Sequence, residues 1–562
     1  MPYRQLAERG FAAPDDGVPL VALNVSAQSA LPVSELLDRL PDVPTPLSGG
    51  GFDLDDEEYA RKVGQVIRDE IGSGAGANFV LRRTYTADIG GYSPLSALSL
   101  FRRLLLRERG VYWTFLVHAA GHTLVGASPE RHVSFDGATA VMNPISGTYR
   151  YSATGPTLQG VTKFLADRKE TDELYMVLDE ELKMMGRICK GGGRVTGPYL
   201  KEMAHLAHTE YLIEGRSDRD VREILRETLF APTVTGSPLQ SAAQVIARYE
   251  PEGRGYYAGV AALIGRNTAG QRTLDSTILL RTAHLDTTGR VSIPVGATVV
   301  RHSAPATEAA ETRAKAAGLL AALQAPDENP AFAAHPEVRA LLTQRNEGLS
   351  GFWLGQEPEP VDGRSPGVDL AGLSLLVVDA EDNFTAMLGH QLRSLGAEVD
   401  VRRHDDFHAH AGYDVVLLGP GPGDPTATDD PRINQLRSEV DALLERRAPL
   451  VAVCLSHQLL SARLGFQLHR RARPHQGVQH QIDLFGTAER VGFYNSFAAL
   501  SEDSKRDVPG VGPVAVSRDE NTGEVHALRG PHFVSMQFHA ESVLTVNGPR
   551  ILAAAVRGVA SR

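Results

Sequence analysis

The sequence predicts an α+β domain of antiparallel sheets with helices, joined to an α/β domain built on a parallel sheet. In the first part, strands are followed by helices and then by strands again, which is an α+β order and not a regular βαβ array. In the last part, residues 374–379, 415–418 and 450–454 are continuous apolar strands that alternate with helices. That pattern is typical of a parallel sheet covered on both faces. At 562 residues the chain is also too long for a single core.

Periodicity and helix-start signals give the elements of the first domain in order. A helix opens after residue 52 with acidic residues in its first turn, where the helix dipole favours them. Strands are predicted at 79–81, 112–118, 123–127 and 132–135. Helices are predicted at 167–185, 218–230, 238–249 and 307–323, and further strands at 258–264, 274–282 and 291–300. Residues 1–50 indicate no chemistry.

A stretch rich in Pro, Gly and acidic residues separates the two domains. It predicts a linker with a short helix at 336–345. The predicted boundaries are therefore 1–325 for the first domain (core about 50–320), 326–370 for the linker and 371–562 for the second domain.

Composition excludes some classes of function. With 57 Lys and Arg against 68 Asp and Glu the net charge is −11, and no basic patch persists, which argues against binding to nucleic acid or to anionic membranes. Only two cysteines occur, Cys189 and Cys454, which favours a reducing compartment over a disulfide framework. The N-terminus lacks an apolar signal core and no apolar run is long enough to span a bilayer. We therefore expect a cytoplasmic protein.

The stretch around Cys454 carries the clearest chemical signal. Apolar residues lead up to the cysteine and a helix-compatible run follows it, so that the thiol would lie on a sharp strand-to-helix turn. A helix N-terminus favours the thiolate. The alternative is a buried structural cysteine. His539 and Glu541 favour catalysis, since they could supply a base and its orienting carboxylate, and the glycine-rich loop at 419–425 could stabilise an oxyanion.

Carboxylates of the first domain recur at helical spacing. Glu170 and Glu173 share one helix face, and so do Glu308 and Glu311, with Lys315 one turn further on. Such pairs on facing helices offer the hard oxygen ligands that Mg²⁺ prefers. The alternative is two solvated helix faces with i,i+4 salt bridges.

The cysteine, histidine, glutamate and glycine loop, in this order, resemble a class I glutamine amidotransferase over about residues 372–560. Such a domain releases ammonia from glutamine. The resemblance implies that Cys454 is the nucleophile, that His539 moves the proton and that Glu541 orients His539. It further implies oxyanion and glutamine-binding residues: Gly421, Leu455, Gln458, Ser496 and Phe497.

Several ordered motifs before residue 320 resemble the chorismate-utilising enzymes. They lie at 127–130, 144–148, 203–208, 235–238, 257–259, 275–282 and 296–315. The resemblance implies a Mg²⁺ site of Glu170, Glu173, Glu308 and Glu311, with Glu173 and Glu311 as direct ligands. Glu130 would be the general acid that protonates the departing 4-hydroxyl, and His208 would face the pyruvyl side. The implied chorismate-binding residues are Ser146, Thr148, Tyr257, Arg281, Gly296 and Lys315.

Departures from the family pattern narrow the expected reaction. Asn78 stands where water-using relatives place a lysine, so ammonia is the expected nucleophile. Ser146 stands where some aminodeoxychorismate synthases carry a covalent lysine and where anthranilate synthases usually have alanine. Thr298 ends a Gly-Ala-Thr run in place of Gly-Ala-Gly.

Motifs at 143–148, 178–183, 454–458, 492–497 and 538–542 resemble one branch most closely, the fused 2-amino-2-deoxyisochorismate (ADIC) synthases of phenazine biosynthesis. The resemblance implies glutamine-dependent amination of chorismate at C2 with Mg²⁺ as cofactor, in a homodimer. The runner-up is an anthranilate synthase, which adds the elimination of pyruvate. A regulator that binds chorismate or glutamine without turnover is the alternative from another class.

Overall fold

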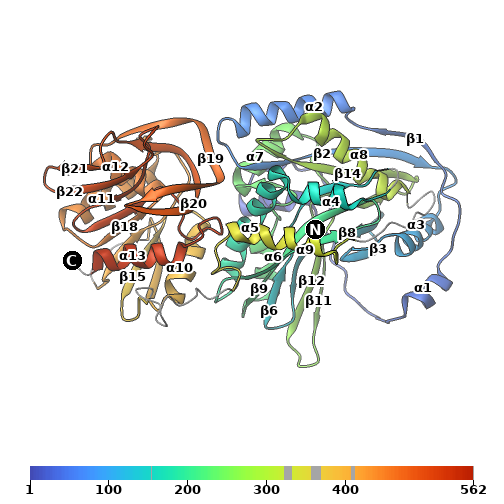
Figure 1. The fold of residues 1–562 in the computed structure, drawn as a ribbon. Coiled ribbons are helices and arrows are strands. Elements are labelled where there is room, and N and C mark those ends of the chain that lie inside the picture. The colour runs from blue at the N-terminus through green and yellow to red at the C-terminus, as the bar shows by residue number, and fades with distance from the viewer. Residues whose placement is uncertain (153–154, 322–331, 356–368, 407–411, 561–562) are drawn as a thin grey trace. The chain divides into compact units, whose positions relative to one another are not determined.

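The computed structural model describes residues 1–152, 155–321, 332–355, 369–406 and 412–560 (Figure 1). Contacts divide the chain into two compact units. The first comprises Met1–Glu181 and Thr196–Arg345, and the second Leu182–Val195 and Asn346–Arg562. The predicted linker lies partly outside the described residues. Within the described residues, no helix is both long and apolar enough to cross a membrane.

The first unit contains two antiparallel sheets. One has the order β1 (Leu47–Phe52), β2 (Asn78–Ile89), β14 (Arg290–Val300), β13 (Thr282–Leu285), β4 (His122–Ser128) and β3 (Trp113–Ala119), with β10 (Gly236–Ser237) also beside β2. The other has the order β11 (Val260–Arg266), β12 (Arg272–Ile278), β5 (Arg131–Phe135), β6 (Thr139–Met142), β9 (Leu206–Arg216) and β7 (Ile145–Arg150), with β8 (Arg194–Glu202) beside β9.

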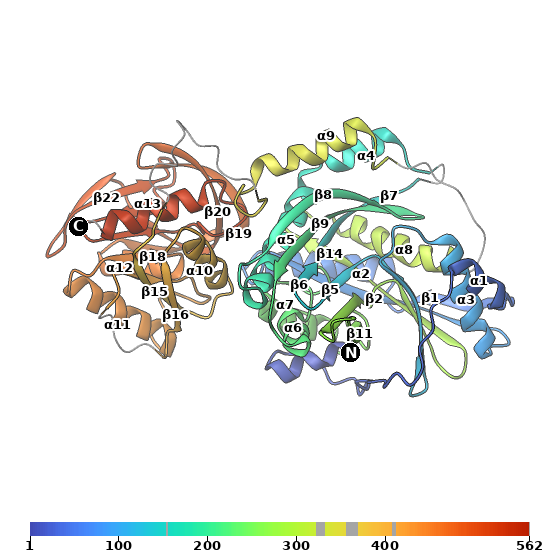
Figure 2. The same cartoon turned by 90° about the horizontal axis from the view of Figure 1, so that it is seen from below.

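Helices pack around these sheets (Figure 2). They are η1 (Tyr3–Arg9), α1 (Val33–Arg39), α2 (Asp56–Gln65), η2 (Val66–Ile71), α3 (Pro94–Arg107), α4 (Leu158–Leu165), α5 (Arg168–Ile188), α6 (Val221–Thr228), α7 (Leu239–Tyr249), α8 (Pro305–Ala321) and α9 (Pro336–Arg345). Helix α2 begins as the acidic run predicts, because the Asp55 side chain caps it by accepting from the Glu58 amide. Tyr59 and Val63, one turn apart, then bury its apolar face against the first sheet.

Several elements differ from the sequence prediction, and two of these differences concern the second sheet and the predicted linker. Strands β8 and β9 were not predicted, although β9 carries the last three residues of the 203–208 motif into the second sheet. Helix α9, predicted inside the linker, packs Val338 and Leu342 against Val161 and Phe164 of α4. The apolar residues of α9 therefore form part of the hydrophobic core of the first unit.

The second unit is built on one mixed sheet. Its order is β16 (Glu398–Arg403), β15 (Ser374–Asp379), β17 (Val415–Leu418), β18 (Leu450–Val453), β24 (Phe533–Met536), β23 (Val525–Arg529), β22 (Gly512–Arg518) and β21 (Lys505–Val508). Pairing is parallel from β16 to β24 and antiparallel beyond it, so the predicted parallel sheet has an antiparallel extension. A long hairpin forms separately from β19 (Gln467–Leu484) and β20 (Thr487–Leu500).

Alternation along β15 explains why this sheet is covered on both faces. Leu375 and Val377 contribute to a core with α10 (Phe384–Ser394) and α13 (Gly548–Ala560). Leu376 and Val378 contribute to another with α11 (Pro431–Glu445) and α12 (Leu455–Arg463). Successive side chains of a strand point to opposite faces, so an uninterrupted apolar strand needs helices on both sides. The short η3 (Asn346–Gly348) begins the continuous part of this unit.

Candidate active sites

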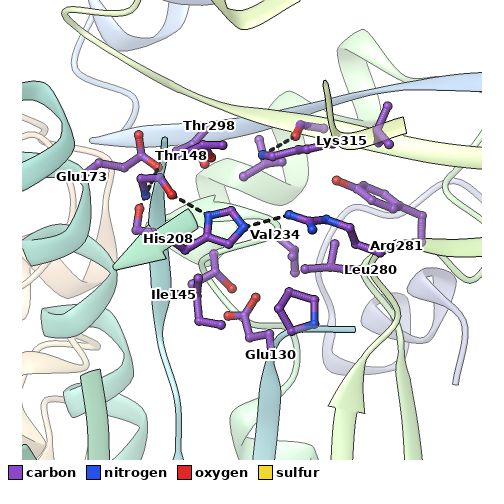
Figure 3. A pocket seen from close by; sticks show the side chains of 18 of the residues that line it. Glu130, Ile145, Thr148, Glu173, His208, Val234, Leu280, Arg281, Thr298 and Lys315 are labelled. Atoms are coloured by element: carbon purple, nitrogen blue, oxygen red, sulfur yellow. Dashed lines mark hydrogen bonds between the residues drawn. The ribbon is translucent and has the colours of Figure 1, made fainter. Parts of the chain in front are cut away.

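A polar pocket in the first unit gathers most of the residues predicted to bind chorismate (Figure 3). Its walls come from both sheets, with β14 on one side and β7 and β9 on the other. Of the predicted residues it is lined by Glu130, Ser146, Thr148, Glu173, His208, Tyr257, Arg281, Gly296 and Lys315. Segments far apart in the sequence thus meet as the family resemblance implied.

Glu130 is suited to hold a proton at neutral pH. It lies between β4 and β5, is only 3% exposed, and its Oε1 atom has no hydrogen-bond partner in the described part of the chain. Burial raises the pKa of Glu130 to about 8, although nearby Lys201 and Lys315 act to lower it. A carboxyl group that stays neutral at pH 7 can serve as a general acid.

His208 is held neutral in one tautomer. Its Nδ1 atom lies 2.6 Å from the carbonyl oxygen of Gly147, which can only accept, so Nδ1 carries the proton. Its Nε2 atom then accepts from the Arg281 guanidinium at 2.8 Å. Burial and Arg281 lower the pKa of His208 to about 3. Arg281 itself has a φ of +49°, a left-handed conformation that is uncommon for residues other than glycine and is often found at functional sites.

The loop and strand at 145–148 hold the predicted metal carboxylates in place. Ser146 donates from its hydroxyl to Glu173 Oε1 at 2.6 Å, so its oxygen remains free only to accept. The Thr148 amide donates to Glu170 at 3.1 Å and its hydroxyl to Glu311 at 3.2 Å. Helices α5 and α8 therefore present both carboxylate pairs to one end of the pocket.

These carboxylates fit a divalent cation by their chemistry. Glu308 is 1% exposed, and neither of its carboxylate oxygens has a hydrogen-bond partner in the described residues, which leaves both to a cation. Burial and then the neighbouring carboxylates raise the pKa of Glu170 and of Glu308 to about 7. Among the described residues no three acidic, histidine or cysteine groups are already close enough to hold an ion together. Mg²⁺ needs few protein carboxylates, because it keeps several waters.

Lys315 of α8 and Gly296 of β14 form another part of the wall. The Lys315 ammonium donates to the Gly296 carbonyl at 2.9 Å and pairs with Glu311 at 2.6 Å. Burial acts to raise the pKa of Glu311, but the positive charges of Lys315 and Lys169, with a hydrogen bond from Lys315, together outweigh it and the pKa falls to about 2. A Cβ atom on Gly296 would come within 2.4 Å of the Tyr257 hydroxyl, so only glycine allows this close approach.

The second unit contains the predicted cysteine site. Cys454 links β18 to α12 with a φ of +52°, the strained turn that the sequence predicts. His539 Nδ1 lies 2.8 Å from Glu541 Oε1, and both side chains are buried. Burial acts to lower the pKa of His539, but Cys454 and Glu541 outweigh it and hold the pKa well above its usual value. His539 therefore holds a proton next to the thiol, while its Nε2 atom has no hydrogen-bond partner within the described residues.

The predicted glutamine-binding residues are partly brought together. Gln458 donates to the Phe497 carbonyl at 2.9 Å, which joins α12 to β20. A Cβ atom on Gly421 would come within 2.8 Å of the Leu455 side chain, so these two predicted oxyanion residues are neighbours. Ser496 is half-buried on β20 beside Phe497.

The pocket also contains residues that sequence reasoning did not assign. Thr233, Val234, Leu280 and Pro294 line it without having been predicted. Thr298 had been noted only as a departure from the family pattern, and it too lies in the wall. Asn78 is buried at the start of β2, is not among the lining residues, and neither polar atom of its side chain has a hydrogen-bond partner in the described chain.

Known proteins match both units. A family described as chorismate binding enzyme matches residues 35–321, and class-I glutamine amidotransferase matches residues 376–559. The phenazine-specific anthranilate synthase of Pseudomonas chlororaphis is 59% identical over 561 residues, covering 99% of this chain and 87% of that protein. The counterpart from Pseudomonas fluorescens is 59% identical over 557 residues, with the same coverage.

More distant relatives match in part. The anthranilate synthase of Azospirillum brasilense is 31% identical over 471 residues, covering 80% of this chain and 58% of that protein. The solved structure of anthranilate synthase component I from Streptococcus pneumoniae is 26% identical, with a TM-score of 0.43, and covers 51% of this chain and 65% of that one.

The fold and the two sites define an enzyme that joins a Cys–His–Glu amidotransferase site to an acid-containing pocket in one chain. The chain belongs to the chorismate-binding enzymes and carries a class I glutamine amidotransferase domain.

Proposed function

We propose that the protein is a glutamine-dependent ADIC synthase, which aminates chorismate at C2 in a reaction that requires Mg²⁺. The observation that carries the proposal is the buried Glu130, a neutral acid in a pocket that also contains the cationic groups of Arg281 and Lys315. Chorismate carries two carboxylates and a hydroxyl leaving group, and these groups complement the pocket. The 59% identity to the phenazine-specific anthranilate synthases supports the same assignment.

The second unit would supply the ammonia. Cys454 Sγ attacks the amide carbon of glutamine, and protonated His539 gives its proton to the departing ammonia. Glu541 keeps the imidazole oriented through Nδ1. Water then hydrolyses the thioester to glutamate, and the thiol is restored.

The first unit would consume the ammonia that the second unit releases. Ammonia forms a bond to C2 of chorismate, the ring double bond shifts, and the C4–oxygen bond breaks. Glu130 protonates the leaving hydroxyl, which departs as water. Arg281 and Lys315 would bind the substrate carboxylates, and Thr148 would position the ring.

Glu173 and Glu311 would hold Mg²⁺ directly, with Glu170 and Glu308 reaching the ion or its waters. The ion would supply positive charge next to the ring carboxylate of the substrate. The donor set supports this role, because both oxygens of Glu308 are buried without a hydrogen bond in the described residues.

The pocket favours ADIC over anthranilate as the product. Loss of pyruvate requires a base to remove the C2 proton, and Nε2 of His208 accepts a hydrogen bond from Arg281. Ser146 and Thr298 add hydroxyl groups to the wall where anthranilate synthases usually have a methyl group and a hydrogen atom. A displacement of about 1 Å can slow a reaction on the order of 100-fold, which is enough to stop the second step.

Product analysis tests the proposal. Purified protein with chorismate, glutamine and Mg²⁺ should accumulate a non-fluorescent amino acid with the mass of ADIC, which releases anthranilate only on harsher treatment. Anthranilate and pyruvate formed together, at the rate of chorismate loss, would identify an anthranilate synthase instead.

We also propose that the protein works in the cytoplasm, as its composition suggests, and that it is a homodimer, as the family resemblance implies. Light scattering of the purified protein should give twice the chain mass of 60.5 kDa. A mass of one chain at micromolar concentration would contradict the dimer.

A further inference from the structure

Lys169 lies among three of the four carboxylates proposed to bind the metal. Its Nζ atom is 3.3 Å from Glu170 Oε1, 3.5 Å from Glu173 Oε2 and 3.3 Å from Glu308 Oε1. The first two belong to α5, like the lysine itself, and the third to α8. The contact with Glu308 is an ion pair without hydrogen-bond geometry, since that oxygen has no hydrogen-bond partner in the described residues.

The charge balance explains why a cation is needed at this place. Four carboxylates that share a buried region repel one another strongly, because burial removes the solvent that would screen them. Lys315 pairs with Glu311 at 2.6 Å and leaves the other three carboxylates to a second cation. Lys169 lies within 3.5 Å of a carboxylate oxygen of each of these three residues.

We propose that Lys169 is a built-in counter-cation, whose ammonium group occupies the Mg²⁺ position in the metal-free enzyme and has to leave before the ion binds. This inference rests on the proposed function, because it concerns the same metal site. It assigns Lys169 a positioning role that is distinct from those of the carboxylate ligands.

The volume that the ammonium group occupies and the exposure of the Lys169 side chain both support an exchange of the ammonium for Mg²⁺. Mg²⁺ binds oxygen at about 2.0–2.1 Å, so an ion held by these carboxylates would occupy the volume that the ammonium fills. The lysine stem is flexible, and the side chain is 18% exposed, whereas Glu308 is 1% exposed. The ammonium therefore has a route to solvent that the Glu308 carboxylate lacks.

The exchange would couple metal binding to substrate binding. In the free enzyme the ion has to displace a favourable ion-pair network, so binding is weak. A substrate carboxylate adds a further oxygen donor and negative charge, which favours the divalent ion over the single charge of the ammonium. Lys169 would thereby make Mg²⁺ binding depend on chorismate.

Metal titration of full-length Lys169→Met tests this directly, with Lys163→Met as the control that removes one exposed positive charge from α4. Calorimetry with Mg²⁺, and electron paramagnetic resonance with Mn²⁺, would be done without and with chorismate. Without chorismate, Lys169→Met should bind the ion at least about tenfold more tightly than wild type, because a like charge has been removed from the site. Lys163→Met should match wild type.

Thermal unfolding gives an independent readout. In excess chelator, Lys169→Met should unfold at a lower temperature than wild type, and Mg²⁺ should restore more stability to it than to wild type. Lys169→Gln, which keeps much of the length and remains polar, guards against a variant that fails to fold.

Two results would overturn distinct claims. If folded Lys169→Met and Lys169→Gln bind Mg²⁺ no more tightly than wild type without chorismate, Lys169 is only a structural ion-pair partner and the inference is wrong. If wild type binds no Mg²⁺ even with chorismate, the metal part of the proposed function fails instead.

Discussion

Cys454 is the residue at which local strain and chemistry coincide. Its left-handed backbone ends β18 and starts α12, which holds the thiol near His539. Cys454→Ser should lower glutamine-dependent turnover by at least about 1,000-fold, because the weak hydroxyl nucleophile replaces the thiol. Turnover with high ammonium salt at alkaline pH should stay within about twofold of wild type.

Cys189 provides the matched control. It is also buried, and burial raises the pKa of its thiol to about 12, so it is inert as a nucleophile. Cys189→Ser should keep glutamine-dependent turnover. Loss of both activities in a folded Cys454→Ser protein would show that Cys454 is not a dedicated glutaminase residue.

Glu130 should make both the activity and the stability of the protein fall as the pH rises. The folded protein holds the proton up to pH about 8, whereas an unfolded carboxyl releases it near its ordinary value of 4.5. The stability associated with neutral Glu130 is therefore fully present below pH 4.5 and is lost as the pH rises through about 8. Over the same window kcat/KM should be high, falling above pH 8 as the acid ionises.

Glu130→Gln tests both statements. The variant should lose chorismate turnover by about 100-fold or more. Its melting temperature should exceed that of wild type by an amount that grows from pH 5 to pH 8. The matching difference in the free energy of unfolding should reach up to about a few kcal/mol at pH 8. A difference in melting temperature that does not change with pH would contradict the raised pKa.

Among single residues, the sequence predicted those with a distinctive functional group in a motif. It did not predict the apolar residues that only shape the pocket. Glu130, His208 and Lys315 were found by resemblance, and the structure gathers them in one pocket. Val234 and Leu280 carry no chemical signal, and only the fold places them in the wall. The Arg281–His208 hydrogen bond was also out of reach, because it joins the bend between β12 and β13 to strand β9.

At the scale of elements, α5 and α8 together form the acidic end of the pocket. Glu311→Gln removes one charge of the four while keeping the shape of α8. It should abolish chorismate turnover, because the proposed ion loses a direct ligand, and should leave glutamine hydrolysis intact. Excess chelator should have the same effect on wild type, and unchanged turnover in chelator would refute the metal requirement.

Helix α9 shows that a segment resembling a linker can be structural. Leu342 is 5% exposed in the core with α4, and Arg345 of the same helix donates to the Leu165 carbonyl at 3.0 Å. Leu342→Ala should lower the stability of the first unit by about 2–4 kcal/mol. Gln344→Ala, an exposed change on the same helix, is the control, and equal melting temperatures of the two variants would contradict the packing role.

Helices and strands with a clear hydrophobic periodicity were predicted more accurately than strands whose formation depends on pairing with a neighbouring strand. Helix α7 (Leu239–Tyr249) and strand β14 (Arg290–Val300) agree with the predicted 238–249 and 291–300 to within a residue. Strand β8 contains Gly197 and Pro198, which read as a helix break and not as a strand. Its place beside β9 supplies the partner that the local sequence cannot show.

At the scale of the molecule, the two units interleave along the chain. The second unit takes in Leu182–Val195, so the boundary falls within α5 and not in the Pro-rich stretch alone. Within that unit Arg187 donates to Asn383 at 3.0 Å, and the Val195 amide donates to the Trp353 carbonyl at 2.7 Å. Composition shifts mark linkers, but they cannot show that a segment from the first half of the chain completes the second unit.

Trp353 tests this interleaving, because it precedes the predicted second domain yet supports the cysteine site. It is 1% exposed, and its indole N–H donates to the Glu541 carbonyl at 3.0 Å. Trp353→Ala should destabilise the second unit by about 3–5 kcal/mol and displace the turn after β24 that carries Glu541 and His539.

Glutamine-dependent turnover should then fall at least about tenfold, because small displacements of catalytic residues strongly reduce the reaction rate. Ammonium-dependent turnover of the first unit should persist. Trp353→Phe keeps part of the aromatic packing and removes the hydrogen bond, so its loss should be smaller than that of Trp353→Ala. Assays of both nitrogen sources, beside melting curves, measure these effects. If Trp353→Ala retains full glutaminase activity and stability, residues 346–355 are a linker after all and the second unit begins near residue 369.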